Sequence, residues 1–180
     1  MGVGMKLTIR KASVSDVGAV GNFYEDVCGY LQAHVNYPGW QKGIYPAEDT
    51  AADAVGEGSL YVAVKDGRIA GSMILKHRPE PGYDTVRWKQ ELPYDKVLVI
   101  CTFAVHPDYS GQGIAGMMIE FAEELARQQG MKSLRLDATE NNIPAIRLYE
   151  KHGFEYRATI DMGLEDIGLK WFKVFEKLVK

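Results

Sequence analysis

The sequence has 180 residues, a length that suits one domain, and we expect a single domain over residues 1–180. Hydrophobic residues make up 46% and charged residues 25%, the balance of a globular chain that can bury a sizeable core. The formal net charge of -3 and the lack of a long Lys/Arg run exclude a broad positive surface for nucleic acid.

Cysteine and histidine positions exclude two further classes of protein. Cys28 and Cys101 are too few for a disulfide framework, and both lie in apolar stretches, so we expect buried thiols in a reducing compartment. The four histidines are scattered without zinc spacing, so no metal is expected. Residues 1–7 show no targeting pattern, and no apolar run is long enough to span a membrane. We therefore expect a cytoplasmic protein with no membrane partner.

The first half of the chain predicts two strands joined by a hairpin, preceded by one strand and two helices. Ser13 followed by Asp16 resembles a helix start, and Asp66-Gly67 between two apolar runs is a strong hairpin signal. In chain order we expect a strand at 7–10, a helix at 15–35, an aromatic, turn-rich segment at 36–46, a short helix at 47–55, and strands at 60–64 and 69–75.

The second half predicts a buried strand and two further helices, with strands between and after them. Continuous apolar character at 97–101 suits a strand covered on both faces. Gly130 and Gly153 mark helix ends, and Pro144 suits a first helical turn. In order we expect an irregular, mostly polar segment at 79–95, a strand from 97, a helix at 114–126, a strand at 134–136, a helix from Pro144, and strands at 154–162 and 169–179. This order predicts an α/β mixed sheet with helices on its faces.

A glycine-rich turn separates the buried strand from the helix that follows it. The first amides of a helix lack internal partners and carry partial positive charge, so this turn predicts a phosphate-bearing ligand. Gly111-x-Gly113-x-x-Gly116, with Asp137 further on, also fits the dinucleotide fingerprint. The spacer 107–110 and the late place in the chain argue against that fingerprint. A turn used only for tight packing is a third interpretation.

Two signatures in this frame resemble those of the GNAT superfamily of N-acetyltransferases. Ser110-Gly111-Gln112-Gly113-Ile114-Ala115 is similar to the family's coenzyme turn, and Asn142-x-x-Ala145-x-x-Leu148-Tyr149-x-x-x-Gly153-Phe154 is similar to its second signature. The element order matches as well, so the resemblance covers about residues 6–179. It implies a central, mostly antiparallel sheet with two splayed parallel strands and flanking helices. Ser110 departs from the family pattern, which has Arg or Gln at this position.

The resemblance implies acetyl-CoA as cosubstrate, held mainly by backbone groups. The pantetheine arm would pair with the backbone of the strand before the turn, and the pyrophosphate would rest on the amides of the turn. Asn142 would hydrogen-bond the pantetheine arm, although it also suits a helix N-cap. The implied cofactor-binding residues are Phe103, Val105, Gly111, Gln112, Gly113, Ile114, Ala115, Gly116, Asn142 and Tyr149.

Tyr149 is the implied catalytic group beside the CoA sulfur, where its phenol would stabilise developing negative charge. The strand at 97–105 contains no acid, so the general base stays open. Glu25, Asp26 and Glu140 are candidates, as is a water relay. Cys101 as a covalent nucleophile is the less favoured alternative, since no His partner is visible in the sequence.

The resemblance implies transfer of acetyl to a primary amine, on a small molecule or a peptide, by direct attack in a ternary complex. Aromatic residues in the segments that wall the acceptor site in this fold are candidate substrate contacts, with surface anchoring of loops as the alternative: Tyr30, Trp40, Tyr45 and Trp88. A CoA-binding sensor without turnover and a plain interaction domain are the other functional classes. Homodimers are common in this fold.

Overall fold

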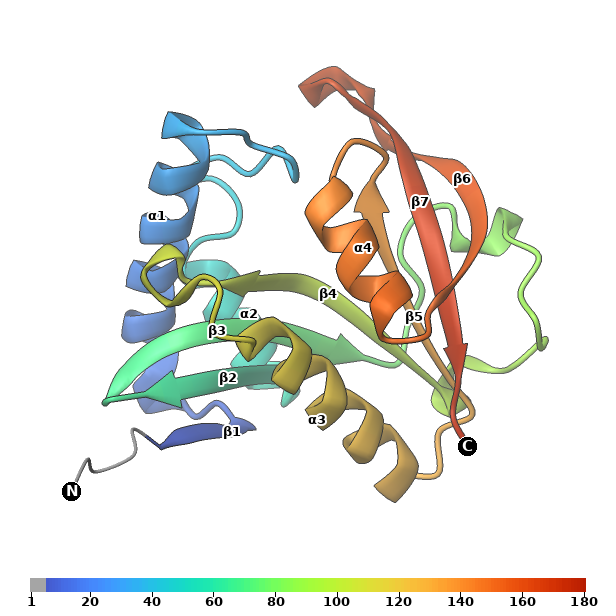
Figure 1. The fold of residues 1–180 in the computed structure, drawn as a ribbon, viewed down its shortest axis with the longest axis horizontal. Helices are drawn as coiled ribbons and strands as arrows, with labels where there is room; N and C mark the ends of the chain where they lie inside the picture. Colours follow the sequence, from blue (N-terminus) through green and yellow to red (C-terminus); the bar gives the residue numbers. More distant parts are fainter. Residues whose placement is uncertain (1–5) are drawn as a thin grey trace. The chain divides into compact units, whose positions relative to one another are not determined.

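The computed structural model describes residues 6–180, and its helices and strands follow the expected order (Figure 1). Residues 1–5 lie outside the described residues. They include most of the segment for which no targeting pattern was expected. The strands are β1 (Leu7–Lys11), β2 (Leu60–Lys65), β3 (Arg68–Lys76), β4 (Val97–Val105), β5 (Ser133–Thr139), β6 (Glu155–Leu164) and β7 (Leu169–Leu178). The helices are α1 (Val17–Ala33), α2 (Glu48–Glu57), α3 (Ile114–Gln128) and α4 (Ile143–Lys151).

The strands join in the order β1-β2-β3-β4-β5-β7-β6. β1–β2, β2–β3, β5–β7 and β6–β7 are antiparallel, whereas β4 and β5 are parallel, with Val97 opposite Ser133 and Val99 opposite Arg135. The expectation of a mixed sheet with flanking helices is confirmed. The chain falls into two compact units.

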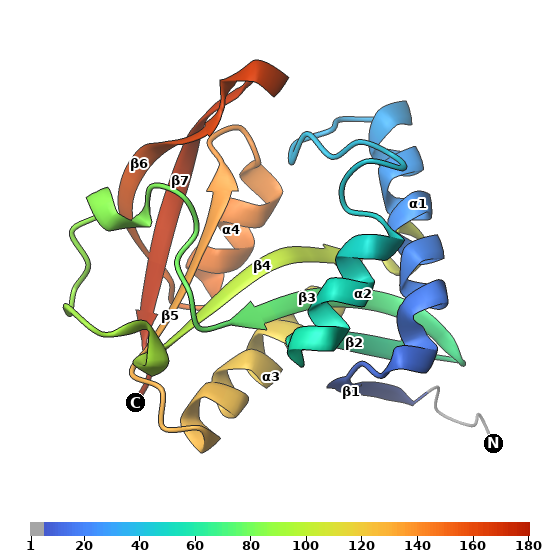
Figure 2. The ribbon, with the colours of Figure 1, turned by 180° about the vertical axis from the view of Figure 1, so that it is seen from behind.

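The first unit comprises the described part of Met1–Val35 together with Trp40–Leu75 and Thr102–Phe121. Helices α1 and α2 lie on one face of the β1–β2–β3 ladder, and the start of α3 lies on the other (Figures 1 and 2). Gly71 allows this close approach, because a Cβ there would lie 2.5 Å from the Met118 sulfur.

Local signals in the first unit act as the sequence predicted. Asp66 and Gly67 both adopt positive φ (53° and 73°), as the tight turn between β2 and β3 requires. The Asp16 carboxylate accepts a hydrogen bond from the Ser13 amide at 2.8 Å and pairs with Arg10 at 2.7 Å. The Arg10 hydrogen bond, followed by those from Ser13, holds the pKa of Asp16 well below its usual range. These contacts fix the chain ahead of α1.

The second unit comprises Asn36–Gly39, Lys76–Cys101 and Ala122–Lys180. Helix α4 covers one face of β5, β7 and β6, and the segment between β3 and β4 crosses the other face (Figures 1 and 2). Helix α4 starts as predicted, with Asn142 as N-cap accepting from the Ala145 amide at 3.2 Å. It ends before Gly153, whose φ is +81°.

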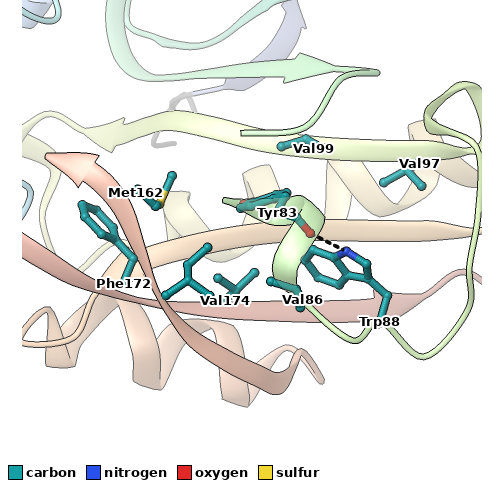
Figure 3. Packing of buried hydrophobic residues seen from close by; sticks show 9 residues of the cluster. Tyr83, Val86, Trp88, Val97, Val99, Met162, Phe172 and Val174 are labelled. Carbon is teal, nitrogen blue, oxygen red and sulfur yellow. Dashed lines mark hydrogen bonds between the residues drawn. The ribbon is translucent and has the colours of Figure 1, made fainter. Parts of the chain in front are cut away.

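The segment at 79–95 is irregular, as expected, with the short 3-10 turns Tyr83–Thr85 and Tyr94–Lys96, but three of its side chains belong to the core. Tyr83, Val86 and Trp88 are buried and pack against residues of β4, β6 and β7 (Figure 3). The indole N–H of Trp88 donates to the Tyr83 carbonyl at 3.1 Å, the dashed bond in Figure 3. Sequence reasoning missed this because the aromatic residues have no regular spacing and find their partners only in the folded sheet.

A buried ion pair fastens the same segment to β5 and β7. Arg135 and Glu176 have side-chain exposures of 1% and 0%, and Arg135 Nε lies 3.1 Å from Glu176 Oε2. Glu176 also accepts from Ser133 Oγ and from the Lys89 amide. The Arg135 guanidinium stacks 4.0 Å from the centre of the Trp88 ring. Burial of two charges is tolerated because these contacts satisfy them.

Among the helices described, none combines the length and apolar character needed to cross a membrane. Within residues 6–180 no group of three or more His, Cys, Asp and Glu side chains is arranged to hold a metal ion. Cys28 is buried as expected, whereas Cys101 keeps partial exposure, so the expectation of two buried thiols is wrong for Cys101.

Candidate functional site

The glycine-rich turn in the first unit has the backbone geometry of an anion seat. Gly111 and Gly113 both adopt φ of +76°, which L-residues rarely adopt, and nothing lies within 4 Å of a Cβ at either position. The turn is exposed and leads directly into α3, whose first hydrogen bond runs from the Met117 amide to the Gly113 carbonyl at 3.1 Å. The amides of Ile114, Ala115 and Gly116 precede the first helical partner and can bind an external anion.

Two cations from the β2–β3 hairpin stand beside this turn. Lys65 Nζ donates to the Gln112 side chain, and its ammonium lies 5.9 Å from the centre of the Tyr109 ring. Arg68 lies 5.7 Å from the same ring and 3.4 Å from Asp108. Sequence reasoning missed both residues, although two cations flank the Asp-Gly hairpin turn. They bring positive charge to a turn that lacks the family's Arg or Gln at Ser110.

A buried histidine braces the strand end that leads to the turn. His106 Nδ1 accepts from the Asp108 amide at 3.1 Å, so the proton belongs on Nε2, which donates to Asp26 at 3.0 Å. Its own amide donates to the Ala70 carbonyl at 2.8 Å. Asp26, a candidate base from sequence, is thus held by a histidine.

The end of β4 in the first unit departs from regular strand geometry. Thr102 has φ of +47°, unusual for a β-branched residue, and its hydroxyl lies 2.6 Å from the Tyr45 hydroxyl. Phe103 and Val105 follow on the same strand and are half-buried. Backbone strain of this kind occurs often at functional sites.

Asn142 and Tyr149 both lie in the second unit, at the start of α4 and near its end. Because the Asn142 carbonyl oxygen caps the helix, its amide NH₂ remains the group that can donate to a ligand. Tyr149 is buried against Phe154 and Phe175. Burial, and then the charge of Asp137, raise the pKa of Tyr149 well above its ordinary value, so the phenol stays protonated.

A second tyrosine in this unit binds a carboxylate. The Tyr83 hydroxyl donates to Asp137 Oδ2 at 2.7 Å, and the two residues are 54 positions apart in the chain. The pKa of Asp137 is raised to about 6, because burial raises it more than the Tyr83 hydrogen bond lowers it, while Glu80 and Lys76 have smaller, opposite effects. Sequence analysis singled out Asp137 only as part of a dinucleotide fingerprint and predicted no partner for it.

The four aromatic residues expected at an acceptor site have different surroundings. Tyr30 is exposed and stacks on His34 with ring centres 3.9 Å apart. Tyr45 is exposed and Trp40 is half-buried, and all three belong to the first unit. Trp88 is 8% exposed and packs in the core of the second unit, so packing accounts for its side chain.

Comparison with known sequences gives a consistent set of relatives. The model of the acetyltransferase (GNAT) family matches residues 30–154. Streptothricin acetyltransferase of Streptomyces lavendulae is 29% identical over 110 residues, which cover 61% of this chain and 51% of that protein. Spermine/spermidine N(1)-acetyltransferase of Bacillus subtilis (strain 168) is 33% identical over 69 residues, covering 38% and 45%. The chain thus spans about half the length of these curated relatives.

Solved structures match over nearly the whole chain. A GNAT-family acetyltransferase from Streptococcus agalactiae superposes with a TM-score of 0.80 at 19% identity, covering 97% of this chain and 96% of that one. The yncA protein of Salmonella typhimurium, solved with its cofactor acetyl-CoA, gives 0.70 at 17% identity, covering 97% and 94%. At these identities the likeness establishes the fold, and it confirms the fold expected from the two sequence signatures.

Proposed function

Because the chain belongs to the acetyltransferase (GNAT) family, we propose that it transfers the acetyl group of acetyl-CoA to a primary amine. The observation that carries this proposal is the exposed turn at Gly111 and Gly113, whose left-handed backbone leads into the free amides of α3. The alternative of a dinucleotide is disfavoured because Asp137, its expected ribose ligand, is bound by Tyr83.

Acetyl-CoA is assigned to the same residues that the resemblance implied. The pyrophosphate would accept hydrogen bonds from the amides between Gly111 and Gly116, with Lys65 and Arg68 adding positive charge. The backbone of Phe103 and Val105 would pair with the pantetheine arm. In the second unit, the amide NH₂ of Asn142 would donate to a pantetheine carbonyl.

Tyr149 is proposed as the group that stabilises the leaving thiolate. A thiol has a pKa of about 8.5, and burial holds the pKa of Tyr149 well above its ordinary value, so full transfer of the phenolic proton to sulfur is unfavourable. A neutral phenol still donates a strong hydrogen bond to an anion in a buried environment. Tyr149 therefore acts as a hydrogen-bond donor as the carbon–sulfur bond breaks.

Direct attack by the amine is favoured over an acetylated cysteine. Cys101 would need a histidine base, and the two histidines closest to β4 in sequence hydrogen-bond other groups. His77 contacts the Val97 carbonyl at 2.8 Å, and His106 contacts Asp26. Acetyl label that remained on acid-quenched protein, and was lost in Cys101→Ala, would instead establish a covalent step.

The acceptor is proposed to be an aliphatic amine with an extended cationic or apolar body. The relatives named above are acetyltransferases of streptothricin and of spermine or spermidine. The exposed ring of Tyr30 and the rings of Trp40 and Tyr45 offer faces that attract cations. A peptide amine is the second acceptor class to be screened, since one similar structure is a ribosomal-protein-S18-alanine N-acetyltransferase from Escherichia coli.

Calorimetric titration with acetyl-CoA, with NAD and ATP as comparison ligands, tests the coenzyme. We expect saturable binding of acetyl-CoA alone, whereas binding of NAD instead would contradict the assignment. A screen of diamines, polyamines and short peptides, read by the mass of the acetylated product, then tests transfer. Binding of acetyl-CoA without any acetylated product would favour a CoA sensor over an enzyme.

A further inference from the structure

The reaction needs a group that removes a proton from the attacking amine, and the strand before the turn holds no acid. Within the second unit, one carboxylate combines three properties that such a group requires. Asp137 keeps part of its surface exposed, and a hydrogen bond from Tyr83 holds it in one orientation. It is also close enough to Tyr149 for its charge to raise the pKa of that phenol. The Tyr83 hydroxyl donates to Oδ2, and Oδ1 accepts none of the hydrogen bonds found among residues 6–180.

We propose that Asp137 is the proton acceptor for the attacking amine and that Tyr83 is the residue that positions it. This inference rests on the proposed acetyl transfer. The neutral amine attacks the thioester carbonyl carbon, and the new carbon–nitrogen bond leaves a positive charge on nitrogen. Asp137 Oδ1 takes one proton from that nitrogen. The carbon–sulfur bond then breaks with its electron pair on sulfur, facing the Tyr149 phenol, and Asp137 returns the proton to water.

The surroundings of Asp137 suit this role better than those of an ordinary surface carboxylate. The titratable and charged groups around it are Tyr83, Glu80, Lys76 and, from α4, Tyr149. Lys76 and Glu80 pair with each other, and Cys101 acts on Tyr83. With a pKa of about 6, Asp137 is ionised at neutral pH and is a stronger base than an ordinary aspartate, whose pKa is about 3.9.

Tyr83 controls the basicity of this carboxylate. The phenol is fully buried in the core of the second unit, so its hydroxyl is delivered to Asp137 in a fixed position. Its hydrogen bond favours the ionised carboxylate and lowers the pKa of Asp137. Removal of that hydroxyl should raise the pKa and move the onset of activity to higher pH.

The test compares Asp137→Asn, Tyr83→Phe and the exposed control Glu150→Gln with the unmodified protein. The turnover number is measured with acetyl-CoA at saturating acceptor from about pH 5 to about pH 9. Two acceptors of different amine pKa are taken from the screen above. They separate the fall in turnover at acidic pH that is caused by a group of the protein from the fall that is caused by protonation of the amine. Acetyl-CoA affinity and the melting temperature are measured for each variant. The carboxylate is also titrated directly by its carbon-13 resonance.

We expect Asp137→Asn to lose about 10²-fold or more in turnover and to keep its acetyl-CoA affinity. The fall in turnover at acidic pH that Asp137 causes should be absent from this variant. Tyr83→Phe should keep its activity at high pH. The pH of half-maximal turnover and the midpoint of the carbon-13 titration of Asp137 should both move to higher pH. Glu150→Gln should match the unmodified protein. Full turnover of Asp137→Asn, or an unchanged pH of half-maximal turnover in Tyr83→Phe, would overturn the inference and leave acetyl transfer intact. Failure of the unmodified protein to acetylate any amine would overturn both.

Discussion

Single side chains in the second unit have strongly altered ionisation, and each alteration has a local physical cause. Tyr83 and Tyr149 are buried phenols near the charge of Asp137, and burial is the largest cause of the raised pKa of each. Asp137 itself is shifted mainly by burial. Clusters of altered pKa values are typical of catalytic sites, although structural networks also produce them. The proposed catalytic roles predict changes in turnover when these residues are substituted, and the altered pKa values predict separate changes in stability.

Tyr149→Phe should reduce turnover by about 10²-fold while leaving acetyl-CoA affinity nearly unchanged. The phenyl ring preserves the packing against Phe154 and Phe175 and removes only the donor. Steady-state kinetics and calorimetry measure the two effects. Tyr156→Phe, which removes an exposed hydroxyl bonded to Thr159, is the matched control. Equal loss of turnover and affinity in Tyr149→Phe would indicate a structural role.

Asp137→Asn should make the protein more stable at high pH and not at low pH. The pKa of this carboxyl rises from 3.8 to about 6 on folding, so the folded state binds its proton more tightly than the unfolded state. The unmodified protein therefore loses stability as the pH rises from about 4 to about 6, by at most about 3 kcal/mol. Asp137→Asn has no carboxyl to ionise at this position and should not show this loss. Urea unfolding at several pH values measures the difference. A stability gain that did not depend on pH would contradict the assigned ionisation.

Two structural elements have different proposed roles: the turn ahead of α3 is assigned to coenzyme binding, and the segment between β3 and β4 packs into the core of the second unit. The turn consists of left-handed glycines and free amides, so the binding proposed for it would depend on the backbone. The segment depends on buried side chains, with Trp88 stacked on Arg135 and Lys89 bound through its amide to Glu176. Substitutions in the two elements should therefore affect ligand affinity and folding separately.

Gly113→Glu should abolish acetyl-CoA binding, a loss of at least about 10²-fold in affinity. A negative side chain would enter the space that the phosphates are assigned, where nothing now lies within 4 Å of a Cβ. Gly130→Glu is the matched control, because Gly130 has nearly the same φ (+71° against +76°) and equally open space. Both variants place a non-glycine residue in the left-handed region, at a similar cost of about 1–2 kcal/mol. Unaltered affinity in Gly113→Glu would place the coenzyme elsewhere.

Glu176→Gln should destabilise the fold by about 3–5 kcal/mol, because it leaves the Arg135 cation buried without its counter-charge. The free energy of unfolding in urea measures the loss. Glu165→Gln removes the exposed partner of Lys170 and should cost less than about 1 kcal/mol. Similar small losses in both variants would show that the buried pair contributes no more than a surface pair.

For the molecule as a whole, local patterns predicted the elements well and long-range pairing poorly. The Asp66-Gly67 hairpin, the Asn142 cap and the end of α4 before Gly153 follow from interactions within a few residues. The pairing of Tyr83 with Asp137, the approach of Lys65 to Gln112 and the burial of Trp88 join positions far apart in the chain. Such contacts depend on strand order, which no local spacing encodes. The sequence therefore predicted the turn and Tyr149 as site candidates, and the structure added Asp137 with Tyr83 and the hairpin cations Lys65 and Arg68 as further candidates.

Acetyl transfer can be measured directly by incubating the protein with carbon-13-labelled acetyl-CoA and an amine acceptor. Free CoA thiol and labelled N-acetyl product are quantified in the same samples over time. Attack of an amine on the thioester predicts one labelled amide for every thiol released, with both rates reduced together in Tyr149→Phe. Thiol release without labelled amide would indicate hydrolysis of the thioester, and no release with any acceptor would contradict the proposed function.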